Sequence, residues 1–422
     1  MSRTEQRIMD KKARVHIIGA GISGLTAALV LEKHGFAPVI YEASGSAGGR
    51  VKTEIINGYH LDIGFQVLLE AYPKVQQYLD IQALEPIELW PGAMIFNNGR
   101  REIIGDPLRN IALLWPTIKA GSATFSDKLK VARLNLELQA TSLKDIFNGE
   151  DIPTRDYLLQ KGFSDSMMTN FFLPFFSGIF LEEHLQTSCR MFKFVYKMFG
   201  KGSALIPKDG IGVITDQLVS KLGRTKIKYN RPVYQVKDGA ISFEDGSQQL
   251  SDHIIIATAD TNLTGRTGER SVQWQCSDTI YFECLKDEIR KPLIGLVADS
   301  EALINSIIYL PQGSAVSRIP YILSVTVVKS HQLSSVDLRK QVEADLSRFC
   351  DINDVKFLKH YAIRKGLPVV EDLKNRLPLS AYRLDKNTYL AGDYLLNGSL
   401  NAAMASGEGA ALALIEDHNM AS

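Results

Sequence analysis

The chain has 422 residues, of which 45% are hydrophobic and 23% charged, which is typical of a globular protein rather than a disordered or fibrous one. Its 48 Lys and Arg against 47 Asp and Glu leave a net charge of +1, so no overall field would attract nucleic acid or an anionic membrane. The four cysteines form no CxxC pair, which argues against a metal site and a disulfide framework, and the length suggests two joined domains.

The start of the chain and its apolar runs indicate where the protein resides. The first fourteen residues are charged and lack the apolar stretch of about 7 to 15 residues found in secretory signal peptides. The densest apolar run, 171–181, is broken by Pro174 and is shorter than the ~20 residues that span a bilayer. We therefore expect a cytoplasmic protein.

The first elements in chain order form a βαβ unit. Residues 14–18 are predicted to be a strand, followed by a glycine turn and a helix over 22–34 that Gly35 closes. A second strand is expected over 38–42. From about 70 to 200 the apolar residues recur with helical spacing instead, for example in a helix with Ser126 as its N-cap, so this part is predicted to be a helical insertion.

The remaining elements indicate a second sheet and a closing helix. Between 213 and 260 the pattern predicts a helix, a hairpin turning at Asp238-Gly239 and a buried strand. Several β-rich runs follow between 270 and 370, interrupted by one helix near 335–349. An Ala-rich helix is expected over 399–418.

The turn after the first strand carries a dinucleotide-binding fingerprint. Gly19 permits the tight turn, Gly21 allows a pyrophosphate to approach the backbone, and Gly24 lets helix and strand pack closely. The helix N-terminus then offers free N–H groups to phosphates, and Glu42 can accept hydrogen bonds from a ribose. We expect cofactor contacts from these four residues and from their neighbours Ile22, Ser23 and Ala43.

A second glycine-rich segment follows at Gly48-Gly49-Arg50. Adjacent glycines let the backbone pass close to a ligand, and an arginine can neutralise pyrophosphate or its surroundings; the alternative is a surface loop with a solvated arginine. The segment around Gly64, Phe65 and Gln66 is also a candidate for the binding site. Gln66 is expected either to face the cofactor or to satisfy the backbone of its own turn.

These motifs resemble the flavin-containing amine oxidase superfamily, which includes protoporphyrinogen oxidases and phytoene desaturases. The resemblance recurs in Y-L-A-G-D-Y at 389–394 and G-S-L-N-A-A-M-A-S-G at 398–407. It implies that the cofactor is FAD, with the backbone N–H of Leu400 facing the flavin. The further FAD contacts that it implies are Val233, Ala257, Thr258, Gly392, Asp393 and Ala403.

The resemblance also implies the fold class, an α/β architecture in which a Rossmann-type, glutathione-reductase-like FAD domain is joined to an α+β substrate domain. The FAD domain is expected to be discontinuous, and the substrate domain to combine a helical insertion with a mixed sheet. FAD is expected to be non-covalent, because the last cysteine, Cys350, is far from the C-terminal motif. The expected segments are 1–70, 201–265 and 381–422 for the FAD domain, and 71–200 and 266–380 for the substrate domain.

The reaction is less defined by the sequence. Thr279 stands where many amine oxidases of the superfamily have a lysine, and no catalytic side chain is identified. The aromatic residues 170–181 and 190–200 are expected to be core packing, a hydrophobic tunnel or, with Lys193 and Lys197, a peripheral membrane contact. We expect a desaturase or oxidase acting on a small hydrophobic substrate, with oxygen, a quinone or another carrier as electron acceptor. The alternatives are an amine oxidase and a flavin-dependent isomerase or non-redox scaffold.

Overall fold

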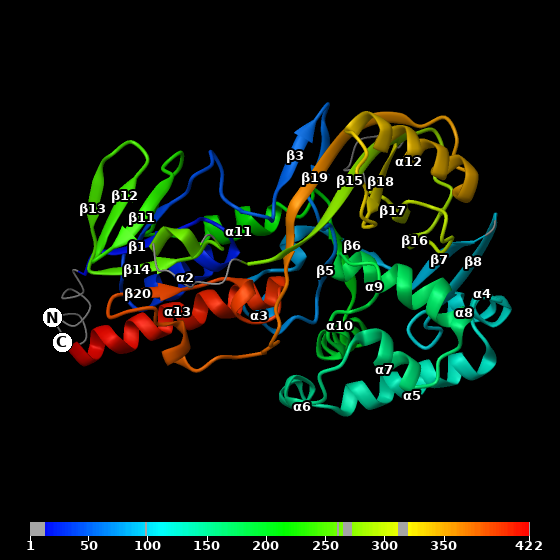
Figure 1. Ribbon diagram of the computed structural model, residues 1–422, viewed down its shortest axis with the longest axis horizontal. Helices are drawn as coiled ribbons and strands as arrows, with labels where there is room; N and C mark the ends of the chain where they lie inside the picture. Colours follow the sequence, from blue (N-terminus) through cyan, green and yellow to red (C-terminus); the bar gives the residue numbers. More distant parts are fainter. Residues whose placement is uncertain (1–12, 98, 260, 265–271, 311–319, 422) are drawn as a thin grey trace.

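The computed structural model describes residues 13–97, 99–259, 261–264, 272–310 and 320–421. The first twelve residues and position 265, which ends an expected domain segment, lie outside this part. The elements form a parallel-sheet region, a mixed-sheet region and a group of helices beneath the mixed sheet (Figure 1). The α/β fold class is confirmed.

A five-stranded parallel sheet of order β10-β2-β1-β14-β20 forms the first region. Its strands come from three separate parts of the chain, so the region is discontinuous in sequence. Alternate residues of β1 face opposite sides, with Ile17 packing towards the helices and Ile18 towards the small sheet β11-β12-β13. The strands are β1 Val15–Ile18, β2 Val39–Tyr41, β10 Lys226–Lys228, β11 Val233–Lys237, β12 Ala240–Phe243, β13 Gln248–Leu250, β14 His253–Ile256 and β20 Thr388–Leu390.

Helices α2 (Ile22–Lys33) and α13 (Leu400–Ala421) pack together along this sheet, with α11 (Val213–Ser220) beside α2. The close approach of α2 and α13 depends on Gly407, since a Cβ there would lie 2.1 Å from the carbonyl oxygen of Ser23. The N-terminal ends of helices from opposite ends of the chain are thereby brought to one edge of the sheet.

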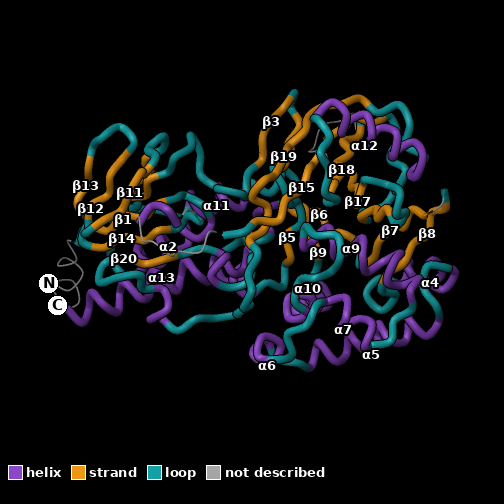
Figure 2. The backbone as a smooth tube through the Cα atoms, viewed as in Figure 1, coloured by secondary structure: helices purple, strands orange, loops and turns teal. Residues whose placement is uncertain are grey.

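The mixed-sheet region is a seven-stranded sheet of order β19-β15-β18-β17-β16-β7-β8. Helix α12 (Ser335–Cys350) covers one face of it (Figure 1). The long strands β15 and β19 run from the parallel-sheet region into this sheet, as Figure 2 shows. The strands are β7 Gly92–Asn97, β8 Arg100–Gly105, β15 Trp274–Cys284, β16 Ile294–Val297, β17 Ile304–Tyr309, β18 Tyr321–Val327 and β19 Lys356–Pro368.

Residues 71–200 are not all helical, which corrects the prediction for this segment. Strands β7 and β8 add to the edge of the mixed sheet, where β7 pairs in parallel with β16, a long-range contact that local periodicity does not reveal. Short strands β5 Leu68–Leu69, β6 Pro86–Leu89 and β9 Ala204–Pro207 form a further small sheet, and β3 Thr53–Ile56 pairs with β4 Tyr59–Asp62.

The helices below the mixed sheet begin near residue 111. The N-cap of α5 is Thr124 and not the predicted Ser126, because Thr124 and Asp127 form a reciprocal capping box. Helix α9 follows five residues of π-helix, which place Pro174 in its first turn, where a missing N–H is tolerated. These helices are α4 Leu114–Lys119, α5 Phe125–Ala140, α6 Leu143–Asn148, α7 Thr154–Gln160, α8 Asp165–Met167, α9 Leu173–Phe180 and α10 Cys189–Lys201, whereas α3 Pro73–Tyr78 packs against α13.

Candidate active site

The glycine turn after β1 has the geometry that its sequence predicts. Gly19 has φ +100°, and a Cβ on Gly24 would lie 2.1 Å from the carbonyl oxygen of Gly19. Gly21 instead faces the second glycine-rich segment, with its hypothetical Cβ 4.0 Å from the Cα of Gly49. Two backbone segments without side chains therefore form one wall of a cavity.

Glu42 closes this turn from the end of β2. Its buried carboxylate accepts hydrogen bonds from the backbone N–H of Ala20, at 2.8 Å, and of Ser44, at 2.9 Å. The carboxylate thus fixes the turn while its side chain lines the cavity. Its contact with a ribose stays a prediction.

Arg50 joins the N-terminal and C-terminal motifs. Its guanidinium donates to the carboxylate of Asp393 at 2.5 Å and to the carbonyl oxygen of Gly366 at 3.1 Å, and it lies over the ring of Trp274. The Asp393 side chain is 5% exposed, so this arginine is the charge that balances a buried carboxylate. The arginine is therefore not the solvated side chain of a surface loop.

The N-terminus of α13 opens on the same cavity. Ser399 caps it by accepting a hydrogen bond from the N–H of Ala402, and Leu400 and Ala403 line the cavity. The first N–H groups of a helix have no acceptor within the helix, so this end carries positive potential.

Most of the predicted cofactor residues line this one cavity, whose volume is about 2370 Å³. Three do not. Gly24 packs beneath the turn, Ala43 is exposed, and Val233 pairs with Phe243 in the small sheet. Those that line it are Gly19, Gly21, Ile22, Ser23, Glu42, Gly48, Gly49, Arg50, Gly64, Phe65, Gln66, Ala257, Thr258, Gly392, Asp393, Leu400 and Ala403.

Gln66 connects the cavity wall to the mixed sheet. Its buried side-chain amide donates to the hydroxyl oxygens of Tyr281, at 2.6 Å, and of Ser324, at 2.7 Å. Tyr281 in turn donates to the carbonyl oxygen of Asp62. Gln66 lines the cavity as predicted, but its amide nitrogen binds two paired residues of the mixed sheet, on β15 and β18, instead of satisfying its own turn.

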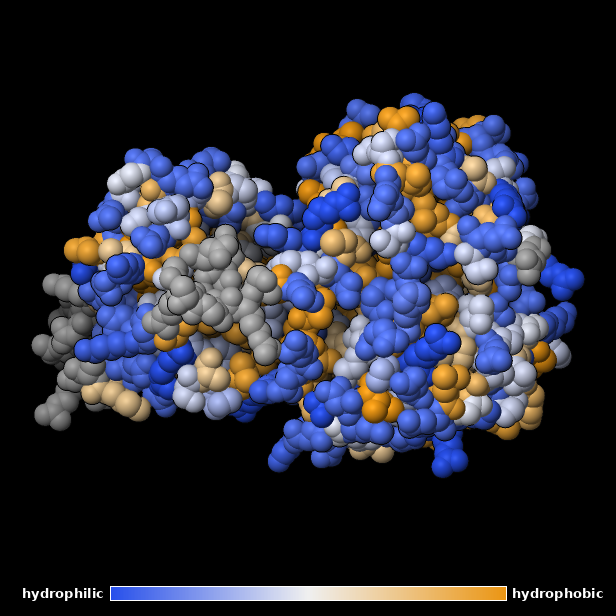
Figure 3. Space-filling view, in the orientation of Figure 1, coloured by the Kyte–Doolittle hydropathy of each residue, from blue (hydrophilic) through white to orange (hydrophobic). Residues whose placement is uncertain are grey.

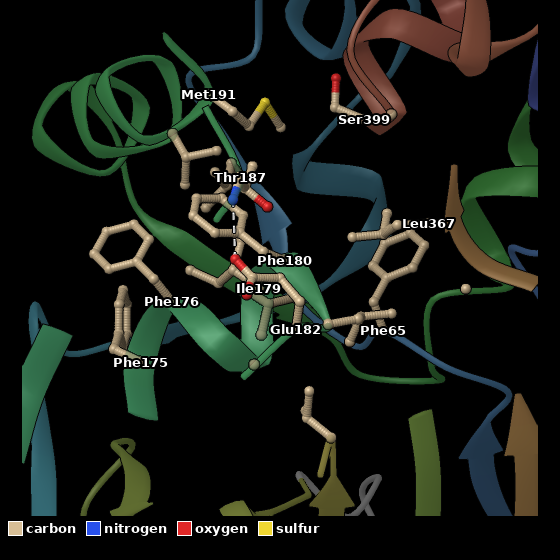
Figure 4. Close-up of a pocket in the computed structure, with 18 of the residues that line it drawn as sticks. Phe65, Phe175, Phe176, Ile179, Phe180, Glu182, Thr187, Met191, Leu367 and Ser399 are labelled. Atoms are coloured by element: carbon tan, nitrogen blue, oxygen red, sulfur yellow. Dashed lines mark hydrogen bonds between the residues drawn. The ribbon is translucent and has the colours of Figure 1, made fainter. Parts of the chain in front are cut away.

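The aromatic residues of the insertion divide between packing and cavity. Phe172, Phe192 and Phe194 are fully buried in the core. Phe171 and Phe175 line the cavity. Figure 4 shows Phe175, Phe176 and Phe180 on one side of the cavity, Phe65 and Leu367 on the other, and Ser399 at the start of α13.

The prediction of a membrane contact through Lys193 and Lys197 is wrong for Lys197. This lysine is buried, and its ammonium donates to the carbonyl oxygens of Leu138 and Gln139; burial lowers its pKa. Lys193 lies over the ring of Tyr157. Helix α10 therefore packs into the core at Lys197, whereas Lys193 is partly exposed.

One polar cluster in the cavity wall was missed by the sequence analysis. The buried Asp278 receives hydrogen bonds from His360 at 2.6 Å and from His331 at 3.2 Å, and it precedes the cavity-lining Thr279. These histidines come from distant segments, so no local pattern predicts the cluster. Within the described ranges no three His, Cys, Asp or Glu form a group suited to a metal ion.

Comparison with known proteins identifies the family. The model of the family described as flavin containing amine oxidoreductase matches residues 22–264, more than half of the chain. The chain belongs to this family. Membership implies a flavin cofactor, typically FAD. In the part of the chain that the structure describes, no helix is long and apolar enough to cross a membrane.

Individual members of the flavin family resemble this chain in part. Protoporphyrinogen oxidase 2, chloroplastic/mitochondrial, of Arabidopsis thaliana is 23% identical over 279 residues, 63% of this chain and 53% of the relative. The L-amino-acid oxidase BmooLAAO-I of Bothrops moojeni is 32% identical over 161 residues, 35% of this chain and 32% of the relative. These matches therefore span about half or less of each relative.

The fold of this chain is also found in solved structures. The CLA-producing fatty acid isomerase from P. acnes superposes with a TM-score of 0.70 at 17% identity, covering 94% of this chain and 98% of the isomerase. This likeness concerns the fold and leaves the reaction open.

Proposed function

We propose that this protein is an FAD-dependent oxidoreductase that transfers a hydride from a hydrophobic substrate to non-covalently bound FAD. The observation that carries the proposal is one cavity that joins the glycine turn at Gly19 to the aromatic wall around Phe175. Its volume of about 2370 Å³ exceeds the ~300 to 1000 Å³ usual for one small ligand. A dinucleotide and a second molecule can therefore share it.

The residues at the glycine end fit FAD. The backbone wall of Gly21 and Gly49 would hold the pyrophosphate beside the N-terminus of α2. Thr258, which lines the cavity, has a buried hydroxyl without a hydrogen-bond partner among the described residues, as expected of a group that binds a ligand. The N-terminus of α13 at Leu400 would face the flavin.

A bound flavin supplies a two-electron acceptor at N5. The chain supplies the conditions for the transfer. The aromatic side chains would exclude water, and the positive end of α13 would stabilise negative charge on a flavin bound beside it. Thr279 lines the cavity at the position where many amine oxidases have a lysine. Threonine has no ionisable group, so the proposed reaction has no lysine base at this position. Oxygen, a quinone or another carrier would remove the electrons.

An amine oxidase is the second candidate, and the similarity of 161 residues to an L-amino-acid oxidase favours it. The threonine at position 279 argues against it. A fatty acid isomerase shares the fold, so a flavin-dependent reaction without net oxidation is the third candidate. In the proposed oxidoreductase the substrate leaves the flavin reduced, whereas in this third candidate the flavin undergoes no net reduction.

The test begins with the visible spectrum of the purified protein before and after acid precipitation. Flavin bands released into the supernatant are expected, because the FAD is proposed to be non-covalent. Anaerobic bleaching is then compared for polyenes, porphyrinogens and amines. Bleaching by amines alone would favour an amine oxidase. Isomerised product without bleaching would contradict the oxidoreductase, and a protein that takes up no FAD would contradict the cofactor.

A further inference from the structure

An exposed apolar surface lies beside the cavity on the side of α4 and α5. Of the nineteen large hydrophobic side chains exposed in the described residues, seven fall between positions 108 and 136. Hydrophobic side chains lie at the surface at this end of the molecule, among hydrophilic ones (Figure 3). The α4–α5 surface consists of Leu108, Ile111, Trp115, Ile118, Phe125, Leu129 and Leu136.

Helix α5 has two apolar faces, although packing in the core needs only one. Leu134 and Leu138 are buried in the core. Phe125, Leu129 and Leu136 are spaced by four and seven residues, so they share a second face, and they are 76%, 58% and 75% exposed. A solvated helix would carry polar residues on that face.

The α4–α5 surface is continuous with the cavity. Leu108, Ile118, Phe125 and Leu136 are both exposed and part of the cavity lining. They therefore lie at its mouth, where the apolar interior meets the apolar surface. An apolar molecule could pass from one to the other along these side chains, beside the polar Asp106, Arg109 and Lys128, which also line the cavity.

The surface is also basic. Positions 108–136 contain five Lys and Arg and one acidic residue, Asp127, which is buried in the capping box of α5. Five minus one gives +4 for this segment, and the flanking Asp106 and Glu137 lower the sum over 106–137 to +2, against +1 for the whole chain. Arg109, Lys128 and Lys130 donate to backbone carbonyl oxygens. These acceptors are uncharged, so they do not neutralise the positive charge of the three side chains.

We propose that the α4–α5 surface docks on an anionic lipid bilayer and opens the cavity to it. Exposed apolar side chains flanked by Lys and Arg are typical of helices that lie in a membrane interface. The core of a protein interface is depleted of lysine, which disfavours a second protein as the occupant. Docking itself is independent of the redox chemistry, whereas delivery of substrate from the bilayer rests on the proposed function.

The experiment uses the full chain without any substrate, so that its failure is distinct from failure of the proposed function. Co-sedimentation is compared for vesicles of phosphatidylcholine alone and vesicles that also contain phosphatidylglycerol. We expect binding to the anionic vesicles that weakens as salt is raised. The variant Trp115→Ser/Phe125→Ser/Leu129→Ser should bind at least about tenfold more weakly.

The matched control is Tyr234→Ser/Leu250→Ser, which removes two exposed apolar side chains from the small sheet of the other region. It should bind like the wild type. An equal loss in both variants would overturn the proposal, as would an absence of binding to anionic vesicles. A wild-type dimer that the triple variant dissociates would assign the surface to a second copy and also overturn it.

Trp115 gives a second readout that needs no triple variant. In the wild type, brominated lipids in anionic vesicles should quench its fluorescence, and Trp115→Phe should lose the quenching while still binding. Quenching that persists in Trp115→Phe would come from Trp90 or Trp274, which are only partly exposed, and would overturn the proposal.

Discussion

The two ends of the cavity are built by different means. The glycine end is made of backbone, where added side-chain atoms would collide with main-chain atoms, as at Gly48, whose Cβ would lie 2.4 Å from the carbonyl oxygen of Val51. The aromatic end is made of side chains such as Phe171 and Phe175, which border open space. The first end can accept one kind of ligand, whereas the second can be reshaped by substitution. In such an arrangement, substitutions of side chains can change which substrate binds without changing which cofactor binds.

The largest expected effect comes from Gly24→Ala at the backbone end. The new Cβ would lie 2.1 Å from the carbonyl oxygen of Gly19, so α2 must shift away from the turn. We expect protein that is purified with little or no flavin, measured by absorption near the flavin band. Gly45→Ala is the control, because its Cβ would meet only the Asn230 side chain, at 3.5 Å. Equal flavin content in both variants would refute the difference.

A pair of substitutions compares core rings with cavity rings. Phe172→Ala opens a hole in the packed core and should lower the free energy of unfolding by about 3 to 5 kcal/mol. Phe175→Ala enlarges an existing cavity and should cost only about 1 kcal/mol while changing the KM of substrates. Denaturant titrations of both variants measure this. If Phe175→Ala is as destabilising as Phe172→Ala, the aromatic end is core and not a binding wall.

Asp62, a buried residue of β4 whose carbonyl oxygen accepts a hydrogen bond from Tyr281, should make stability depend on pH. Burial raises the pKa of its carboxyl to about 6, although Thr53 and the N–H of Ile211 donate to it. In the unfolded chain the pKa of this carboxyl is near 3.8. As the pH rises, the carboxyl therefore ionises in the unfolded state before it ionises in the native state. The native state therefore loses stability between about pH 4 and pH 6, in total on the order of 3 kcal/mol.

Asp62→Asn removes this titration and keeps a side-chain oxygen as acceptor. The stability of Asp62→Asn relative to the wild type should therefore increase between pH 4.5 and pH 7.5, because the wild type loses stability as Asp62 ionises and the variant does not. Urea unfolding at both pH values checks it. An unchanged difference between the two proteins would mean that Asp62 is already ionised in the native state at low pH.

The smallest effect is expected for Arg50→Ala. The substitution leaves the buried Asp393 carboxylate without its charge partner, yet Arg50 itself is 38% exposed, so water moderates the loss. We expect roughly a tenfold weaker affinity for FAD, measured by fluorescence titration. In Arg50→Ala/Asp393→Asn the loss should be smaller than the sum of the single losses. Additive losses would mean that the two residues act separately.

The sequence predicted the parts of the site that depend on local geometry. The turn at Gly19 to Gly24, the helix that begins at Leu400 and, outside the site, the αL residues at Asp238-Gly239 are each defined within a few residues. The same applies to the strands that carry them, because β1 and β14 are short buried runs bounded by turns. Local conformational preferences therefore predicted the glycine turn, whereas Thr258, Asp393 and Leu400 were expected only from the family resemblance.

Only the tertiary structure decided how distant parts combine. The pairing of β7 with β16, the contact of Arg50 with Asp393 and the bracing of Tyr281 by Gln66 join residues 200 or more positions apart. The exposed second face of α5 and the buried Lys197 likewise depend on which neighbours each helix acquires. Periodicity along the chain reports that a face is apolar, but what covers that face is set by packing, which no local pattern contains.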